Sequence, residues 1–201
     1  MSTYKLNIPL TEAAVRELRC GDLVYLSGRV YTARDMAHLR ARKLLGEGQP
    51  LPPGLGREGS ALFHAGPVAV RSGDGWTLSV IGPTTSMRME PHADLLPLLG
   101  VRAVIGKGGM GRTTRRVLRD WGAVYLAAAP GCAVKHASAV CAVHGVHWLD
   151  LGMPEAVWMY DVQSWGPLIV AMDSTGASIY DRVAARAKRV ERRLVNGWLS
   201  L

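Results

Sequence analysis

Several short segments of the sequence place cationic or hydroxyl side chains beside glycines or at the expected starts of helices. Three of these segments carry Arg34, Arg88 and Lys107. Guanidinium and ammonium groups bind carboxylates and phosphates, and an arginine can do so through two parallel hydrogen bonds. The three cations together could therefore neutralise a dicarboxylate.

The segment 82–90 is the most informative of them. Thr84, Thr85 and Ser86 are consecutive hydroxyl residues at an expected helix start, where free backbone amides and hydroxyl donors favour an anion. Arg88 follows Thr84 by four residues and would lie on the same helix face one turn along. Simple capping of the helix needs only one of the hydroxyls, and it is the alternative interpretation for part of this segment.

Arg34 lies where a strand is expected to pass into a helix, with Asp35 beside it and His38 one turn further on. Arg34 could bind a carboxylate there, or it could form an ion pair with Asp35 that caps the helix. His64, which precedes Ala-Gly-Pro, is either a ligand contact or a residue that ends a strand. The residue types leave these alternatives open.

Residues 106–111 read Gly-Lys-Gly-Gly-Met-Gly and satisfy the G-x-G-x-x-G pattern of dinucleotide-binding turns. A dinucleotide site would also need an acidic residue about 20 positions further on for the ribose. Residues 126–129 in that region are Leu-Ala-Ala-Ala. A glycine-flanked Lys107 that reaches a small anion is therefore the better interpretation, with dinucleotide binding as the alternative.

Other catalytic and metal-binding patterns are missing from the sequence. No Ser/His/Asp set has motif context, and there is neither a P-loop nor zinc-type Cys/His spacing. Cys20, Cys132 and Cys141 are too few and too unevenly spaced for a disulfide framework or a compact metal site, and they fit a reducing compartment. We expect Cys20 and Cys141 to be small buried residues. Taken by itself, the chain has the residues of half an active site.

Short strands alternate with helices along the chain, which predicts one mixed α/β domain over residues 1–201. Thr11 is the expected N-cap of a short helix that ends at Gly21. A small helix rich in Ala and Val is expected to begin at Gly131, and residues 46–60, with five glycines and three prolines, are expected to form an exposed loop. Strands are expected at 4–9, 23–26, 67–70, 76–81, 101–105, 123–128, 157–162 and 168–172, and longer helices at 34–45, 113–121 and 179–197.

The composition of 24 Lys and Arg against 16 Asp and Glu gives a net charge of +8, which predicts an anionic partner. Hydrophobic residues make up 48% of the chain, which excludes a disordered or collagen-like protein. No apolar run is long enough to cross a membrane, and the N-terminus lacks the layout of a secretory signal. We therefore expect a cytoplasmic protein with no membrane partner.

Half of the excess charge belongs to the expected C-terminal helix, because residues 181–193 contain six cations and two acids. The segment is interpreted as the solvated face of that helix. An RNA-contacting helix and a docking surface are the alternatives. The side chains expected on the opposite side of the helix are Val183, Ala184, Ala187, Val190 and Leu194.

Four of these segments also occur together, in the same order and spacing, in a known family. They are residues 31–35 with His38, residues 82–90, residues 106–110, and residues 151–155, which read Leu-Gly-Met-Pro-Glu. With them the chain resembles the β subunit, or C-terminal domain, of the iron–sulfur hydro-lyases, class I fumarate hydratase and L(+)-tartrate dehydratase. The resemblance implies an α/β fold, a single swivelling β/β/α domain with a mixed sheet and flanking helices.

The resemblance also implies a partner α subunit, in a heterodimer or an α2β2 complex. That subunit would carry a [4Fe–4S] cluster on three cysteines, so the cluster would not be ligated by this chain. The active site would form between the two subunits, and the cluster iron would act as the Lewis acid that polarises the leaving hydroxyl.

The site residues are implied by the same resemblance. Arg34, Arg88 and Lys107 would hold the carboxylates of the substrate, and Thr84 would lie beside the reacting carbon as the candidate base. A threonine is a poor base at its ordinary pKa, so this role depends on activation by a neighbour, such as an acidic residue of the partner.

Three further residues are implied to support the site. Asp35 and His38 would orient Arg34, and Thr85 is the third supporting residue. The implied reaction is the reversible hydration of fumarate to (S)-malate. Dehydration of L(+)-tartrate to oxaloacetate is the alternative, because each reaction removes water from a 2-hydroxy dicarboxylate. A non-catalytic protein that binds small anions or nucleic acid is a more distant alternative, and nucleic acid is not the expected partner.

Overall fold

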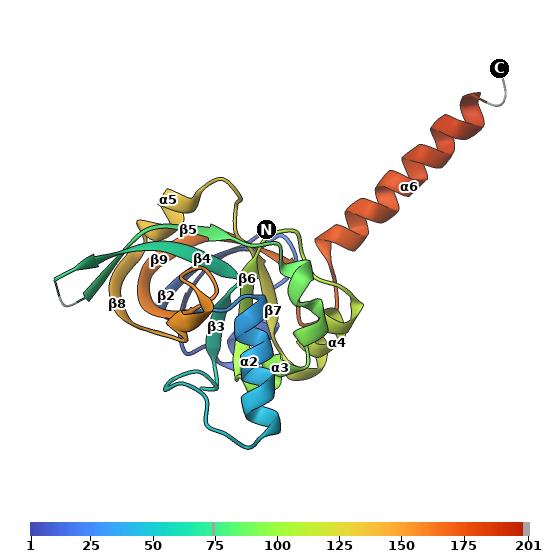
Figure 1. The fold of residues 1–201 in the computed structure, drawn as a ribbon. Helices are drawn as coiled ribbons and strands as arrows, with labels where there is room; N and C mark the ends of the chain where they lie inside the picture. Colours follow the sequence, from blue (N-terminus) through green and yellow to red (C-terminus); the bar gives the residue numbers. More distant parts are fainter. Residues whose placement is uncertain (74, 199–201) are drawn as a thin grey trace.

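The computed structural model describes residues 1–73 and 75–198 of the chain. Five strands form a sheet that closes on itself like a barrel (Figure 1): β2 (Leu23–Thr32), β3 (Ser60–Phe63), β6 (Val101–Gly106), β7 (Val124–Ala127) and β9 (Val157–Met172). Neighbours from β2 to β7 run parallel, and β9 pairs antiparallel with both β7 and β2. The parallel strands therefore all end at the same edge of the sheet.

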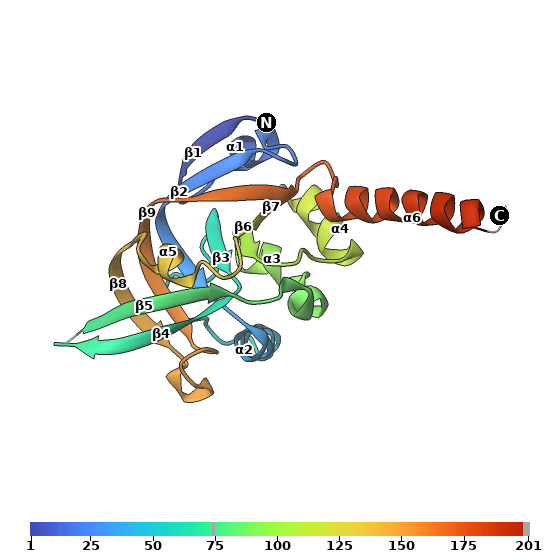
Figure 2. The ribbon, with the colours of Figure 1, turned by 90° about the horizontal axis from the view of Figure 1, so that it is seen from above.

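The remaining strands extend this sheet or cover it. β1 (Thr3–Asn7) lies parallel to β2, and β8 (Val140–His147) lies antiparallel to β9. β4 (Ala65–Ser72) and β5 (Gly75–Pro83) form a separate two-stranded hairpin. The tip of this hairpin points away from the barrel (Figure 2), while its base stays close to the end of β3.

Helices surround the sheet. The N-terminal half of the chain forms α1 (Glu12–Glu17), α2 (Asp35–Gly46), the 3-10 helix η1 (Ser86–His92) and α3 (Leu95–Leu98). The C-terminal half forms α4 (Arg112–Trp121), α5 (Ala133–Ala137), the 3-10 helix η2 (Leu149–Leu151) and α6 (Ile179–Trp198). Thr11 caps α1 as predicted, because its hydroxyl accepts a hydrogen bond from the Ala14 N–H at 3.2 Å. The helix ends at Glu17, earlier than predicted.

The strands divide their side chains between two buried clusters. In β6, Ala103 and Ile105 belong to the cluster that includes the hairpin and α1. Val104 belongs to the other cluster, with Leu95 of α3 and Leu118 of α4. A side-chain period of two with both faces apolar is what a parallel strand covered on both sides requires. The hairpin and α1 therefore pack on one face of β6, and α3 and α4 pack on the other.

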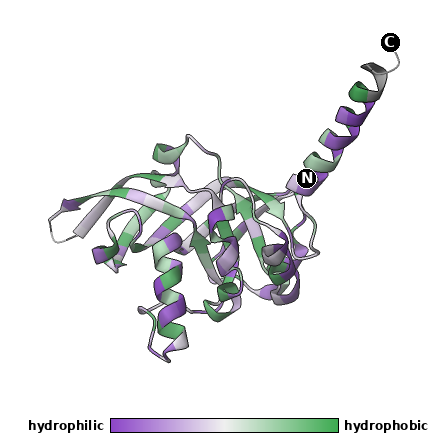
Figure 3. Cartoon of the chain, turned by 45° about the vertical axis from the view of Figure 1, so that its right-hand side comes forward, coloured by the Kyte–Doolittle hydropathy of each residue, from purple (hydrophilic) through white to green (hydrophobic). Residues whose placement is uncertain are grey.

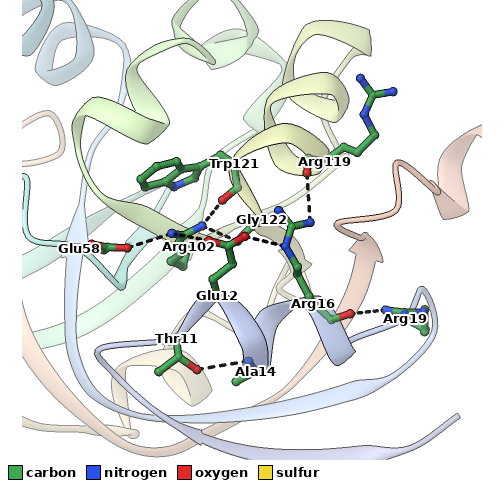
Figure 4. A network of polar contacts seen from close by, with 10 residues as sticks. All are labelled: Thr11, Glu12, Ala14, Arg16, Arg19, Glu58, Arg102, Arg119, Trp121 and Gly122. Carbon is green, nitrogen blue, oxygen red and sulfur yellow. Dashed lines mark hydrogen bonds and ion pairs between the residues drawn. The ribbon is translucent and has the colours of Figure 1, made fainter.

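Arg102 ties the fold together at the opposite end of β6 (Figure 4). Its side chain is 3% exposed, and its Nη2 lies 2.9 Å from Oε1 of Glu58 and 3.2 Å from Oε2 of Glu12. The guanidinium also donates to the carbonyls of Gly122, at 3.1 Å, and Trp121, and it lies 4.0 Å from the centre of the Trp121 ring. Because β6 starts here and ends at the other edge, this network stabilises the sheet from the end remote from Lys107.

The mixed α/β class is confirmed, and most predicted strands are present. Three predictions about strands were wrong or incomplete. Two strands were not predicted: β3, and β8, which follows the short helix α5. The two strands expected at 157–162 and 168–172 are one continuous strand, β9. These strands are defined by pairing with segments far away in the sequence, such as β8 with β9 and β3 with β6.

Helix α6 matches the predicted C-terminal helix closely and extends away from the rest of the molecule (Figures 1 and 2). Hydrophilic residues predominate along it, with hydrophobic ones between them (Figure 3). The apolar side expected opposite the solvated face is itself exposed, at 61% for Val183, 47% for Val190 and 60% for Leu194. Within residues 1–73 and 75–198, none of the helices has the length and apolar character needed to cross a membrane.

Candidate active site

The carboxyl-terminal ends of three neighbouring strands bring the predicted site residues to one edge of the sheet. Arg34 follows β2, His64 follows β3 and Lys107 follows β6. Thr84 reaches this edge from β5, since its N–H donates to the His64 carbonyl at 2.7 Å and its carbonyl accepts from the Lys107 N–H at 3.3 Å. Both open and barrel-shaped α/β sheets commonly bind ligands at the carboxyl ends of their parallel strands. The structure thus brings together segments that lie far apart in the sequence.

Lys107 holds the hydroxyl segment in place through its backbone. Thr85 forms an isolated parallel bridge with Lys107, and the Ser86 N–H donates to the Lys107 carbonyl at 3.0 Å. The amides of Thr84 and Ser86 are therefore already bonded within the chain. The expected cradle of free amides is not formed at these two positions, because the segment continues the edge of the sheet before it enters the 3-10 helix η1.

Arg34 is held by a carboxylate from a distant part of the chain. Its Nε lies 3.2 Å from Oε1 of Glu155, and the two side chains are 21% and 17% exposed. Glu155 also accepts a hydrogen bond from the Met36 N–H at 3.0 Å, so it is fixed to the start of α2. Nη1 of Arg34 lies over Gly66, where a Cβ would come within 2.9 Å of it. Glu155 therefore forms an ion pair with the guanidinium on its Nε side, although Nε is buried without a hydrogen-bond partner among the described residues, and Nη1 lies at the base of the hairpin.

Asp35 pairs with Arg88 and not with Arg34. Nε of Arg88 donates to Oδ1 of Asp35 at 3.2 Å, and Nη2 donates to Oδ2. The side chain of Arg88 is 50% exposed and that of Asp35 is 28% exposed. Arg34 and Asp35, which both lie in the described part of the chain, therefore do not form with each other the ion pair that was the alternative interpretation of this helix start. Asp35 thus orients Arg88, and the orientation of the Arg34 side chain comes from Glu155.

His38 lies buried beneath the backbone of Arg34. Its Nδ1 is 2.7 Å from the Arg34 carbonyl oxygen, a contact that requires a proton on Nδ1. Burial, with a smaller contribution from the stacked His92 ring 5.5 Å away, lowers the pKa of His38 to about 4. His38 is therefore neutral near pH 7 and supports the start of α2 through the main chain.

A buried chain of hydrogen bonds lies behind the edge. The Gly109 N–H donates to the Tyr125 hydroxyl at 3.3 Å, this hydroxyl donates to Ser86 Oγ at 3.0 Å, and Ser86 Oγ is 2.9 Å from Nδ1 of His64. We assign the Ser86 proton to the His64 contact from the direction of this chain. Burial holds the pKa of His64 well below its usual value and raises that of Tyr125. The chain stays neutral and fixes the hydroxyl segment relative to the glycine-rich loop.

Glu90 anchors η1 to the start of α4. Its Oε2 accepts hydrogen bonds from the Gly111 N–H at 2.7 Å and the Thr114 hydroxyl at 2.5 Å, and its Oε1 accepts from the Thr113 N–H at 2.9 Å. A carboxylate at this position satisfies helix amides that lack partners within the helix and interacts favourably with the helix dipole. Glu90 thereby fixes the 3-10 helix that carries Arg88.

An open groove of about 560 Å³ runs along the edge beside Lys107. Thr85 and Lys107 line one part of it, and residues 127–130 and Tyr180 line others. A lysine, a threonine and small apolar side chains therefore border a space that a small molecule or a segment of another protein can enter.

Glu155 and the Tyr125–Ser86–His64 chain are features of the candidate site that sequence reasoning missed or left open. Glu155 belongs to the 151–155 motif quoted for the resemblance, so the motif marked it without indicating its partner. Tyr125 stands in a buried strand and has no local signal in the sequence. Tyr125 comes within hydrogen-bond distance of Ser86 because β7 pairs in parallel with β6.

The three cysteines of the chain lie apart. Cys20 is half-buried, its N–H donates to Asp173 at 2.9 Å, and burial raises the pKa of its thiol to about 11. Cys132 and Cys141 are exposed, so the expectation that Cys141 is buried was wrong. Within the described ranges, no three His, Cys, Asp or Glu side chains are grouped so that they could hold a metal ion.

At this edge Arg34 and Lys107 follow parallel strands, Arg34 and Arg88 pair with acids of the same chain, and Lys107 borders an open groove. These features define a mixed α/β domain with a candidate anion-binding edge. A sequence model for the family described as "Fumarase C-terminus" matches residues 1–183. The chain belongs to this family, which confirms the resemblance seen in the motifs.

Relatives of known name cover most of the chain. A protein of Methanocaldococcus jannaschii, named as a candidate L(+)-tartrate dehydratase subunit β, is 47% identical over 176 residues, or 87% of this chain and 89% of that protein. The L(+)-tartrate dehydratase subunit β of Escherichia coli K12 is 40% identical over 175 residues, or 87% and 85% of the two chains. A candidate class I fumarate hydratase of Geobacillus stearothermophilus is 39% identical over 180 residues, or 89% of this chain and 34% of that longer protein.

Proposed function

We propose that this chain is the β subunit of a two-subunit hydro-lyase that catalyses the reversible hydration of fumarate to (S)-malate. The observation that carries the proposal is the placement of Arg34, Arg88 and Lys107 with Thr84 at one edge of the sheet. The relatives named as β subunits and as a class I fumarate hydratase support the same reaction class.

The three cations are proposed to bind the two carboxylates of the substrate. Arg34 is fixed through Nε by Glu155, so its terminal nitrogens are preorganised to hold one carboxylate. Arg88, oriented by Asp35, and Lys107 on the glycine-rich loop complete the neutralisation. Preorganised groups lose little freedom when the substrate binds, and affinity and alignment both benefit.

Thr84 is proposed as the base at the reacting carbon, with Thr85, Asp35 and His38 as positioning residues. In the dehydration direction a proton leaves C3 of malate, hydroxide leaves C2, and the two form water as the double bond forms. The hydrogen bonds that the structure gives Thr84 run through its backbone. Because a threonine hydroxyl must lose its proton to act as a base, we propose that an acidic residue of the partner subunit activates it.

The partner is proposed to be an α subunit that carries a [4Fe–4S] cluster, in a heterodimer or an α2β2 complex. The cluster supplies a Lewis acid for the departing hydroxyl. The separation of the cysteines in this chain supports placing the cluster on the partner. We further propose that residues 1–201 act as one domain that swivels against the α subunit, and that the complex is cytoplasmic.

Dehydration of L(+)-tartrate to oxaloacetate is the second candidate function. The relatives that match this chain over most of their length are named for that reaction. Tartrate differs from malate by one additional hydroxyl, and both substrates present the two carboxylates that the three cations would bind.

The test is a substrate panel on the complex of this chain with its α subunit, reconstituted anaerobically. Fumarate formation from (S)-malate is followed by its absorbance, and oxaloacetate formation from L(+)-tartrate by a coupled assay. We expect turnover of one of the two substrates that is lost when Arg88 is replaced by alanine. An intact cluster with no turnover of either substrate would refute the proposal.

A further inference from the structure

The first turn of α6 is anchored beside the groove of the candidate site. The ring of Tyr180 packs over Gly109, where an added Cβ would lie 2.4 Å from ring atoms, so only glycine fits there. Asp181 forms an ion pair with Arg115 of α4. Tyr180 also lines the groove that contains Lys107. The helix therefore starts at the site and extends outward from it (Figure 2).

Beyond this anchor, α6 carries a regular apolar stripe. Val183, Ala187, Val190 and Leu194 follow one another at intervals of four, three and four residues, which is the spacing of a helix that packs lengthwise against another helix. Valine and leucine side chains of this stripe are about half exposed or more. The stripe is thus available to a partner.

A ridge of cations runs along one side of the stripe. Arg182, Arg186, Arg189 and Arg193 recur at intervals of four, three and four residues and lie on one helix face. Among the described residues, the ion pairs of α6 are limited to that of Asp181 with Arg115. The ridge therefore keeps its full positive charge beside the apolar stripe.

We propose that α6 is a docking arm for an acidic amphipathic helix of the partner subunit. This inference rests on the proposed function, because a partner that closes the site must cover the edge from which α6 starts. An apolar face on the partner helix would cover the stripe, and its acidic side chains would pair with the arginine ridge. The family match ends at residue 183, so most of α6 lies outside the segment that the family model matches.

The charge and the area of the stripe argue against a second copy of this chain as the occupant. The stripe consists of four side chains on one helix. A contact between two copies that buried only these would fall well short of the roughly 1,200 Å² that a stable dimer buries. Each copy would also bring the same excess of positive charge. An acidic partner that already contacts the neighbouring edge has neither problem.

The decisive measurement is the affinity of this chain for its α subunit, by calorimetry at two salt concentrations. We compare the double variant Arg186→Glu/Arg193→Glu and the single variant Val190→Asp with the unmodified chain. The control, Lys5→Glu/Lys43→Glu, makes the same change in net charge at exposed lysines away from α6. We expect Kd to rise at least tenfold in both α6 variants and less than twofold in the control, with kcat of the saturated complex unchanged.

A second measurement is independent of the enzyme reaction. The probe is a synthetic helical peptide with leucine at the a and d heptad positions and glutamate at e and g, and the matched peptide has lysine at e and g. We expect the acidic peptide to bind the unmodified chain, to lose affinity at higher salt, and to bind the Arg186→Glu/Arg193→Glu variant at least tenfold more weakly. Equal binding of both peptides, or binding of neither, would overturn the arm.

The outcomes separate this inference from the proposed function. Unchanged Kd in an active complex would overturn the docking arm and leave the hydro-lyase in place. Weakened complexes that turn over neither malate nor tartrate would overturn the function and retain the arm. A dimer of this chain that the α6 variants dissociate would assign the stripe to a second copy. Loss of binding to RNA or to phosphatidylserine vesicles in those variants, with the α-subunit Kd unchanged, would assign it to that anion.

Discussion

Replacing Glu155 tests whether a carboxylate behind Arg34 sets the direction of that guanidinium. Glu155 pairs with Nε of Arg34 at 3.2 Å and accepts the Met36 N–H at 3.0 Å. Alanine removes both interactions. Glutamine removes the charge and keeps an oxygen that can accept the amide hydrogen bond. The two variants therefore separate the ion pair from the anchoring of the acid to α2.

The loss of stability follows from the burial of the pair. Both side chains are about four-fifths buried, so solvent screens the pair only in part. The hydrogen bond from the Met36 N–H to the Glu155 carboxylate contributes roughly 1.5–3 kcal/mol, as a bond to a charged group. The partly screened ion pair with Arg34 contributes up to about 1 kcal/mol. We expect the free energy of unfolding to fall by about 2–3 kcal/mol in Glu155→Ala and by about 1 kcal/mol in Glu155→Gln.

Two effects on substrate binding oppose each other. Removing a negative charge from the site would attract a dicarboxylate more strongly, whereas releasing Arg34 would let its terminal nitrogens point elsewhere. The shortest contact of Glu155 with the guanidinium is at Nε, so a substrate carboxylate can pair with the terminal nitrogens. Orientation should therefore dominate, and we expect KM to rise about tenfold in Glu155→Ala, equivalent to about 1.4 kcal/mol.

The assays are urea unfolding of the chain and steady-state kinetics of the complex with its α subunit. Asp150→Asn is the matched control, since Asp150 pairs with Arg40 at 2.6 Å but is 66% exposed. That variant should change stability by less than about 0.5 kcal/mol and leave KM unchanged. A lower KM in Glu155→Ala, or an unchanged KM with the predicted loss of stability, would refute the orienting role.

Three other predictions address the proposed base Thr84, the network around Arg102 and the buried His38. Thr84→Ala should lower kcat by about 100-fold or more with unchanged unfolding, while Thr84→Ser retains most activity; near-normal kcat in the alanine variant would remove Thr84 from catalysis. Arg102→Met should lower the free energy of unfolding by about 2–4 kcal/mol, because the bonds to two carbonyls and the ring contact are lost. In Arg102→Met, kcat of the assembled complex should not change. The control is Arg119→Met, at a side chain that is 57% exposed, and it should lower the free energy of unfolding in urea by less than about 0.5 kcal/mol. The folded-state pKa of His38, about 4, lies below its ordinary 6.5, so the unfolded chain binds the proton first as pH falls. The stability that neutral His38 contributes is present above pH 6.5 and should be lost between pH 6.5 and 4, by up to about 3 kcal/mol. Urea midpoints should show a smaller decline in His38→Gln, and an equal decline would contradict this assignment.

The sequence predicts the parts of the site whose signals are local. Hydroxyls at Thr84, a glycine-flanked Lys107 and an arginine at the start of α2 can each be found by type and neighbours. The partners of these residues cannot, because Glu155 meets Arg34 only after β9 closes the sheet on β2. The same limit applied to strands, since β8 exists through its pairing with β9. A helix-like composition around α5 therefore concealed the strand that follows.

The positive charge of the chain occurs in two settings, which differ in whether an acid of the same chain accompanies it. Arg34 and Arg88 each have a carboxylate of the same chain beside them. Such a pair attracts distant anions weakly, because the two charges cancel at long range, but it gives the guanidinium a fixed direction. A small dicarboxylate that must be aligned for reaction needs direction more than attraction.

The arginine ridge of α6 presents the opposite case. Its charges have no carboxylate of the same helix face beside them, so their fields add along the helix and extend into solvent. Summed charge of this kind speeds the encounter with an acidic protein surface and selects against basic ones. The summed charge does not fix the orientation of a bound helix. In the proposed complex, the apolar stripe would fix that orientation. The net charge of +8 therefore does not describe one anion-binding surface, and substitutions in the two regions should have separable effects, on KM at the site and on subunit affinity at α6.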